Sequence, residues 1–183
     1  MAVPINIADA KSGKLAELDR VEQAQTIIDL SHRMIHEGKH YTFSYVDTDF
    51  DIADAIEVLI VVGSKPAHIS AEVIAGKDTL LQAYEGATHA PAVEYTAYNN
   101  NRVLNTPPTT RLYTHNDGGA DGTLIWTSAF GLSANPTNFA GGIARADDEW
   151  ILRPNTNYLF KVSTGTDNSF LTVHLFWYEE DID

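Results

Sequence analysis

Alternation of apolar and polar residues with a period of two dominates the chain after about residue 40. Tyr41, Phe43 and Tyr45 alternate with small or polar residues, and the segments 56–62 and 69–73 repeat the pattern. Residues two apart share one face of a strand, so this spacing indicates half-buried strands. The same reasoning predicts further strands at 79–84, 93–98, 111–115, 123–130, 150–153, 158–162 and 170–178.

Turn-forming residues separate these segments, for example at 63–66, 118–119, 121–122 and 165–168. Glycine and asparagine tolerate positive φ, and proline fixes φ near the value that a turn requires. Many short strands with such turns, and with no helical pattern between them, are typical of an antiparallel sandwich or barrel. The predicted fold class is therefore all-β, with one domain covering residues 31–183.

The first thirty residues follow a different pattern and form a predicted N-terminal arm. Residues 1–13 are small and polar with few apolar positions, a composition that buries too little surface to order itself. Residues 14–30 contain neither Gly nor Pro, and their apolar spacing predicts a short helix with Ser12 as a cap. The apolar arm residues that we expect to bind a partner are Val3, Pro4, Ile5, Ile7, Leu15, Leu18, Val21, Ile27 and Ile28.

The final predicted strand is apolar on both faces. Phe170, Phe176 and Tyr178 point one way, and Leu171, Val173, Leu175 and Trp177 point the other way. Such a strand is central in its sheet, or an arm or a neighbouring subunit covers its second face. The long segment 131–147 has no period and is either ordered by contact or mobile in solvent. We therefore name Phe139, Ile143 and Trp177 as candidate subunit contacts.

Charge and composition narrow the choice of partners. The 25 acidic residues exceed the 12 basic residues, which leaves a formal charge of -13. Phosphate backbones repel such a chain, so we expect no nucleic-acid partner. The chain has no cysteine, which excludes disulfides and thiolate sites. No apolar stretch approaches the ~20 residues that cross a bilayer, so we expect no membrane partner and synthesis in a cytoplasm.

Two clusters of side chains contain residue types that can bind a metal ion. On one continuous helix, His32, His36 and His40 would stack as ligands, but Gly38 and the strand from Tyr41 favour a polar linker. The carboxylates of the segment 47–51 resemble the start of a calcium loop, yet Ile52 and Val58 replace its required Gly and Glu. An acidic turn explains that segment more simply. We predict no metal site and no cofactor.

The sequence contains no catalytic signature. The G-x-S-x-G elbow is absent, and the carboxylate groups at 147–149 and 179–181 come with no indication of a cleft. Trp126, Trp150 and Trp177 would suit a sugar-binding face if exposed, but they alternate with apolar residues, which favours burial. We predict that the chain is not an enzyme and has no catalytic residues.

Several segments, in order, resemble a family of small virion proteins from tailed phages. The most specific is Glu149–Leu159 (EWILRPNTNYL), and weaker ones are Ala83–Thr88, Asn99–Arg102, Gly122–Ile125 and Phe176–Glu179. The resemblance runs from about Ser31 to the C-terminus and does not include the arm. It implies a jelly-roll-like decoration, or cement, protein that assembles as a trimer on the outer capsid surface.

The resemblance thus leads to the expectation of a structural capsid protein whose partner is the major capsid protein. Attachment through the arm is inferred from its apolar positions and not from the family. The alternative is a tail- or fibre-associated jelly-roll module that binds a carbohydrate or receptor. A hydrolase that uses one of the carboxylate groups is a further alternative.

Overall fold

The computed structural model contains one short helix and twelve strands in its described part. The helix, α1 (Leu30–His36), precedes the first strand, and every strand pairing is antiparallel. The predicted helix at 14–30 lies outside the described residues, apart from Leu30, with which α1 begins. The structure describes residues 30–76, 78–104, 106–116, 118–130, 140–142 and 149–180.

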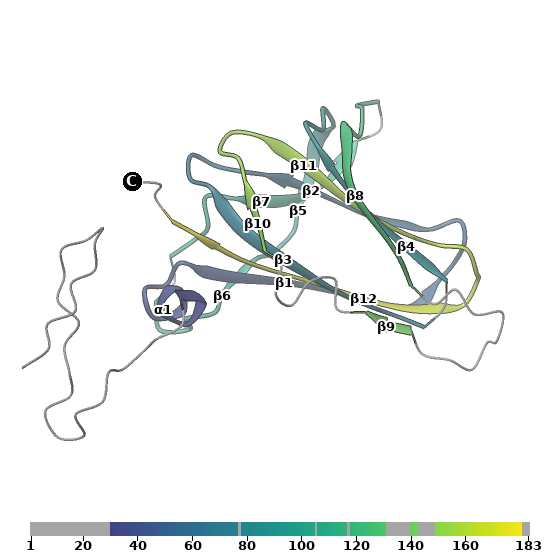
Figure 1. The fold of residues 1–183 in the computed structure, drawn as a ribbon, viewed down its shortest axis with the longest axis horizontal. Helices are drawn as coiled ribbons and strands as arrows, with labels where there is room; N and C mark the ends of the chain where they lie inside the picture. Colours follow the sequence, from purple (N-terminus) through teal and green to yellow (C-terminus); the bar gives the residue numbers. More distant parts are fainter. Residues whose placement is uncertain are drawn as a thin grey trace, which may run out of the picture.

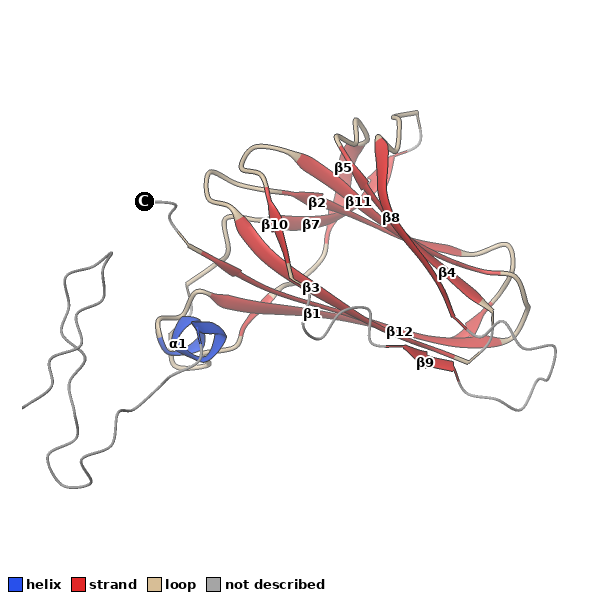
Figure 2. Cartoon of the chain, viewed as in Figure 1, coloured by secondary structure: helices blue, strands red, loops and turns tan. Residues whose placement is uncertain are grey.

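The strands form two six-stranded sheets that face each other (Figures 1 and 2). The first sheet has the order β10 (Trp150–Leu152), β3 (Ala67–Ala75), β12 (Ser169–Glu179), β1 (His40–Phe50), β6 (Tyr98–Asn99), with β9 (Ala140–Gly142) also paired to β3. The second has the order β5 (Ala90–Glu94), β7 (Arg111–Asn116), β2 (Ala55–Val61), β11 (Asn157–Thr164), β4 (Thr79–Glu85), β8 (Thr123–Phe130). The predicted all-β sandwich is confirmed.

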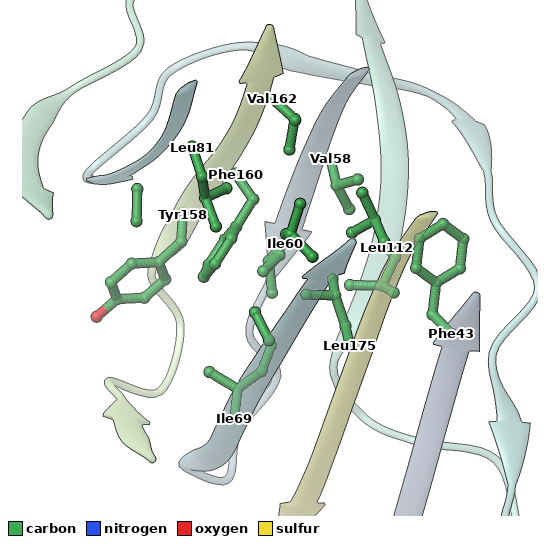
Figure 3. Packing of buried hydrophobic residues seen from close by; sticks show 14 of the residues in the cluster. Phe43, Val58, Ile60, Ile69, Leu81, Leu112, Tyr158, Phe160, Val162 and Leu175 are labelled. Carbon is green, nitrogen blue, oxygen red and sulfur yellow. The ribbon is translucent and has the colours of Figure 1, made fainter. Parts of the chain in front are cut away.

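The core lies between the two sheets and follows the period of two. Along β3, every second residue from Ala67 to Ala75 is buried, and the residues between them are half-buried. Phe160 on β11 and Leu175 on β12 belong to one buried cluster, to which both sheets contribute side chains (Figure 3). Interdigitation of these inward faces is the main stabilising contribution, because each buried aliphatic or aromatic side chain contributes about 1.5–3 kcal/mol.

The final strand is central, which is one of the two arrangements that its two-sided apolar pattern allows. β12 lies between β3 and β1, and it pairs with both along almost its whole length. Leu171, Val173 and Leu175 face the core, whereas Phe176 on the other face is half-buried. Tyr178 on that face is also buried, because it stacks against His68 with ring centroids 4.5 Å apart. Residues of the chain itself therefore cover part of this second face.

The predicted strand boundaries fail in two places. The single strand predicted at 93–98 is two separate strands, β5 and β6, which belong to different sheets. The chain between them passes from the second sheet to the first, and no local pattern marks that change of sheet. β9 lies within the segment 131–147, where no strand is predicted. It exists because the edge of β3 offers a partner for Ala140–Gly142.

In the described part of the chain, no helix is both long and apolar enough to cross a membrane.

Candidate functional site

The first 29 residues join the described domain at α1, on one end of the sandwich (Figure 1). Met34 anchors this helix, because its side chain is completely buried. Gly38 ends the helical path with φ of +70°, and the amide of Lys39 donates to the carbonyl of Met34 at 2.9 Å. This glycine-terminated geometry is a common C-cap. It explains why the helix stops four residues before His40.

Asn99 fastens the loop after β6 to the end of α1. Its side-chain amide donates to the carbonyl of Gly38 at 2.8 Å and to that of Thr106 at 3.0 Å. Its Oδ1 accepts from the amide of Asn101 at 2.8 Å. The Asn99 side chain is 5% exposed, so these bonds satisfy a buried polar group. The loop is therefore held in a defined position.

Asn101 extends the same network to the loop's apolar side chains. Its Nδ2 donates to the carbonyl of His36 at 3.1 Å, which connects the loop to the last residue of α1. Its Oδ1 accepts from the amides of Val103 and Leu104 at 3.1 and 3.2 Å. These bonds form an Asx-type turn, the local structure that asparagine favours. The turn fixes the backbone from which both apolar side chains project.

The result is a set of exposed apolar side chains on the loop that is bonded to the end of α1. Val103 is 91% exposed, Tyr98 is 54% exposed, and Leu104 is 43% exposed. We call Tyr98, Val103 and Leu104 the α1-end patch, because their loop is bonded to the end of α1. Apolar side chains that are exposed together on one loop form a surface that contact with another molecule would bury.

The predicted arm residues Val3, Pro4, Ile5, Ile7, Leu15, Leu18, Val21, Ile27 and Ile28 lie outside the described residues. Phe139 and Ile143, two predicted subunit contacts, also lie outside them. The third, Trp177, has 0% exposure and packs against Tyr41 with ring centroids 5.6 Å apart. The prediction for Trp177 is wrong, because a side chain inside its own core offers no surface to another subunit.

A second candidate site is a cluster of ionisable side chains on the outer face of the second sheet. His115 on β7 contacts Glu57 on β2, with Nε2 2.5 Å from the carboxylate. Glu57 also pairs with Lys161 on β11. These three residues come from neighbouring strands, so the sheet register brings them together. Sequence reasoning missed the cluster, since 104 positions separate Glu57 from Lys161.

His89 and Asp121 complete the cluster from outside the sheet. Their side chains meet at 2.8 Å, and the ring of His89 lies 3.9 Å from the ring of His115, centroid to centroid. Two hydrogen bonds of 2.9 Å join Thr88 to Ala120, next to these residues. The cluster therefore fastens the segment around His89 and the loop before β8 onto the sheet.

Charge pairing shifts two pKa values in the cluster. Burial opposes the ionisation of Glu57, but the hydrogen bonds from Lys161 and His115 outweigh it and lower the pKa of Glu57 below its ordinary value of 4.5. The hydrogen bond to Glu57 raises the pKa of Lys161 above 10.5, against the effect of burial. Both groups are therefore ionised at neutral pH. The arrangement stabilises the fold.

Asp47 and Asp51, two of the acidic residues singled out in the sequence, have structural partners, whereas residues 147, 148 and 181 lie outside the described residues. The carboxylate of Asp47 accepts a hydrogen bond from the backbone amide of Asp49. The carboxylate of Asp51 accepts one from the backbone amide of Asn168 at 2.7 Å. These carboxylates cap turns and do not converge on a common point. Among the residues that the structure describes, no three His, Cys, Asp or Glu side chains are arranged to hold a metal ion.

Glu179 is a buried carboxylate with a structural role. It accepts hydrogen bonds from the amide and hydroxyl of Thr109 at 2.9 and 2.8 Å, and from the amide of Thr110 at 2.7 Å. Burial, and then the charge of Glu179, raise the pKa of Tyr41 to about 12. Three charge-assisted bonds compensate the desolvation of the carboxylate. Glu179 thus ties the strand end to the segment before β7.

A cavity of about 510 Å³ opens beside that segment. The ion pair between Glu94 and Arg111, 2.7 Å apart, stands at its wall. Thr110 also lines it, and the fully buried Thr110 hydroxyl has no partner among the described residues. Its volume is within the range of small-molecule sites. Other lining residues are Tyr95, Ala97, Pro107, Pro108 and Leu112.

Comparison with known proteins gives no neighbour from which to assign a function. No family model, no curated protein and no solved structure matches the chain.

Proposed function

We propose that this chain is a capsid decoration protein of a tailed phage, which binds the outer surface of the major capsid protein and stabilises the head. The observation that carries the proposal is the α1-end patch on the loop that is bonded to the helix following the arm. Val103 and Leu104 are held in solvent there by the hydrogen bonds that their amides donate to Oδ1 of Asn101. Together the arm and the patch provide apolar surface for burial against a neighbour.

We also propose that the sandwich is a jelly roll. Support comes from the sheet order β10-β3-β12-β1 opposite the order β2-β11-β4-β8. Successive strands along β1, β2, β3 and β4, and again along β8, β10, β11 and β12, alternate between the two sheets. Such crossing between sheets is the signature of a jelly roll, a fold found in viral capsid and lectin domains.

The segment that carries the family resemblance forms the turn between β10 and β11. The amide of Arg153 donates to the Tyr158 hydroxyl at 3.0 Å, and Asn155 adopts φ of 54°. The amide of Asn155 donates to the carbonyl of Gly63 at 2.9 Å. A turn with these requirements explains why Pro, Asn and Tyr occur at these positions. The resemblance therefore directly supports a fold shared with the virion proteins. It supports a shared role only indirectly, because that role is inferred from the shared fold.

The remaining parts of the proposal are a homotrimeric assembly, a place on the virion surface and synthesis in the host cytoplasm. Trimerisation is supported by the family resemblance and by the half-buried Phe176 on the outer face of β12. The formal charge of -13 supports solubility before assembly.

Binding to purified heads that lack the protein tests the proposal. The full chain is expected to saturate the heads at hundreds of copies, whereas a variant without residues 1–29 and the variant Val103→Asp/Leu104→Asp are expected to bind at least about tenfold more weakly. Ile151→Asp is the matched control, because Ile151 is 60% exposed on β10, away from the patch. Failure of the full chain to bind would overturn the proposal, and equal binding by all variants would remove the arm and the patch from it.

The alternative function is a tail- or fibre-associated module that binds a carbohydrate or receptor. The cavity beside Thr110 favours it, because Tyr95 and Pro107 offer ring surfaces near a buried hydroxyl. Glycan binding that is lost in Tyr95→Ala, together with a few dozen copies or fewer per virion, would favour this alternative. Hundreds of copies and no glycan binding would favour decoration.

A further inference from the structure

His32 and His36 bring two ring nitrogens together on the exposed side of α1. Their Nε2 atoms lie 3.0 Å apart, and their rings meet edge to face with centroids 4.7 Å apart. The two residues occupy positions i and i+4 of one helix, which places them on the same face. Gly38 turns the chain away before His40, so two of the three histidines in the sequence pattern meet.

The separation fits joint coordination of one ion. Histidine nitrogen binds zinc at about 2.0–2.1 Å, so two such ligands at tetrahedral or octahedral angles stand roughly 2.8–3.4 Å apart. The observed 3.0 Å falls within this range. Both side chains are exposed, so an ion reaches them without rearrangement of the core.

From this geometry we propose that His32 and His36 form a binding site for a divalent transition-metal ion of the Zn²⁺, Ni²⁺ or Cu²⁺ class. Imidazole nitrogens suit these ions, whereas Mg²⁺ and Ca²⁺ prefer oxygen ligands. Two protein ligands leave coordination positions open to water or to a donor from another molecule. The site is therefore of the open kind.

The charges around the pair are compatible with a bound cation. Arg33 lies between the two histidines in sequence, and its guanidinium pairs with Glu37 at 3.3 Å and with Glu180 at 3.1 Å. These carboxylates offset its positive charge. The formal charge of -13 on the chain also raises the local concentration of cations.

A metal at this position would brace α1. Helices of seven residues are marginal in isolation, and α1 depends on the burial of Met34. An ion that joins positions i and i+4 binds the helical form and not the extended form, so it stabilises the helix by mass action. The brace would act where the leading 29 residues join the domain. This inference does not depend on the proposed capsid role.

Titration of the untagged full-length protein with Zn²⁺ and with Ni²⁺, followed by calorimetry, tests the site. The wild type is expected to bind one ion per chain at its tightest site. His32→Gln and His36→Gln are each expected to weaken that binding by at least about tenfold, since each removes one of two ligands. His174→Gln is the control, because His174 is a half-exposed histidine on β12 that pairs with Glu72.

Hydrogen exchange supplies a second readout. Zn²⁺ is expected to slow amide exchange at residues 34–38 in the wild type and not in His36→Gln, and Mg²⁺ is expected to have no effect. Equal Zn²⁺ affinity in the wild type and in both α1 variants would overturn the proposal. An absence of Zn²⁺ and Ni²⁺ binding would overturn it as well, and the 3.0 Å contact would then be a hydrogen bond between neutral rings.

Discussion

His89 and His115 lie ring against ring, although 26 positions separate them in the sequence. The ring centroids are 3.9 Å apart, and the planes are inclined by 32°. The Nε2 atom of each ring forms a hydrogen bond with a different carboxylate. His89 is bonded to Asp121, and His115 is bonded to Glu57. The side chains are 7% and 6% exposed, so the contact is part of the packed structure. It joins the segment before β5 to the outer face of the second sheet.

Glu57→Gln is expected to destabilise the protein by about 1–3 kcal/mol at pH 7, because it removes charge-assisted hydrogen bonds to Lys161 and His115. The folded-state pKa of Glu57 lies below 4.5, so its contribution is present above pH 4.5 and is lost as the pH falls through the folded-state value. The difference in unfolding free energy between wild type and variant should therefore shrink below pH 4.5.

Urea unfolding at several pH values between 3 and 7 measures this difference. Glu72→Gln on the other sheet is the control for removal of a carboxylate that contacts a histidine. A difference that stays constant down to pH 3 would contradict the assigned role of Glu57.

At alkaline pH, the raised pKa of Lys161 adds stability to the folded protein. This stability is present below pH 10.5 and is lost above it.

Gly122→Ala is expected to be more destabilising than Gly118→Ala. Both glycines have φ near +100°, at +100° and +109°, so alanine brings a similar backbone cost of about 1–2 kcal/mol at either position. At Gly122 an added Cβ would lie 2.4 Å from the carbonyl oxygen of Glu85, whereas nothing lies within 4 Å at Gly118. The clash adds about 1–3 kcal/mol. Chemical denaturation of the two variants checks the order, and equal losses would refute it.

Trp177→Ala is expected to cost about 3–5 kcal/mol of unfolding free energy, because it leaves a large cavity between the sheets. The cost should not depend on protein concentration, since the side chain lies inside its own chain. Phe176→Ala is the comparison, because the neighbouring Phe176 points to the other face of β12 and is half-buried. A stability loss for Trp177→Ala that varies with protein concentration would restore its assignment to a subunit interface.

Glu179→Gln is expected to bring the pKa of Tyr41 down from about 12 toward 10, without reaching 10. Burial is the larger cause of the shift and remains, whereas the charge of Glu179 is removed. Ultraviolet titration of the tyrosines, with Tyr41→Phe to identify the signal, measures the change. The variant should also lose about 1–3 kcal/mol, because the Thr109 and Thr110 amides lose a charged acceptor. An unchanged Tyr41 pKa would contradict the coupling.

Local pattern predicted most of the strands because burial alternates along them. The segments 41–45, 56–62, 69–73 and 123–130 all fall within or along observed strands. The failures occur where pairing is decided elsewhere in the chain. β9 is three residues long and needs the edge of β3, and β6 consists of Tyr98 and Asn99 paired with β1. Such short segments have no periodicity of their own.

The candidate sites were less predictable than the strands. Asn99–Arg102 is one of the segments that carry the family resemblance, yet its role in holding Val103 and Leu104 depends on hydrogen bonds within the loop and to α1. The cluster around Glu57 has no local signal, because its members come from three strands and two connecting segments. Among these candidate sites, only the i and i+4 spacing of His32 and His36 can be read directly from the sequence. The cap at Gly38 then decided which histidines meet.

The sequence by itself determined the all-β class and the acidic character, because side-chain alternation and charge are local and additive properties. The tertiary structure alone decided that β12 is central, that Trp177 faces its own core and not another subunit, that His89 meets His115, and that Glu179 is satisfied by Thr109 and Thr110. Sheet order and register bring distant residues together, and these follow from how the whole chain buries its apolar faces at once. No window of neighbouring residues contains that information.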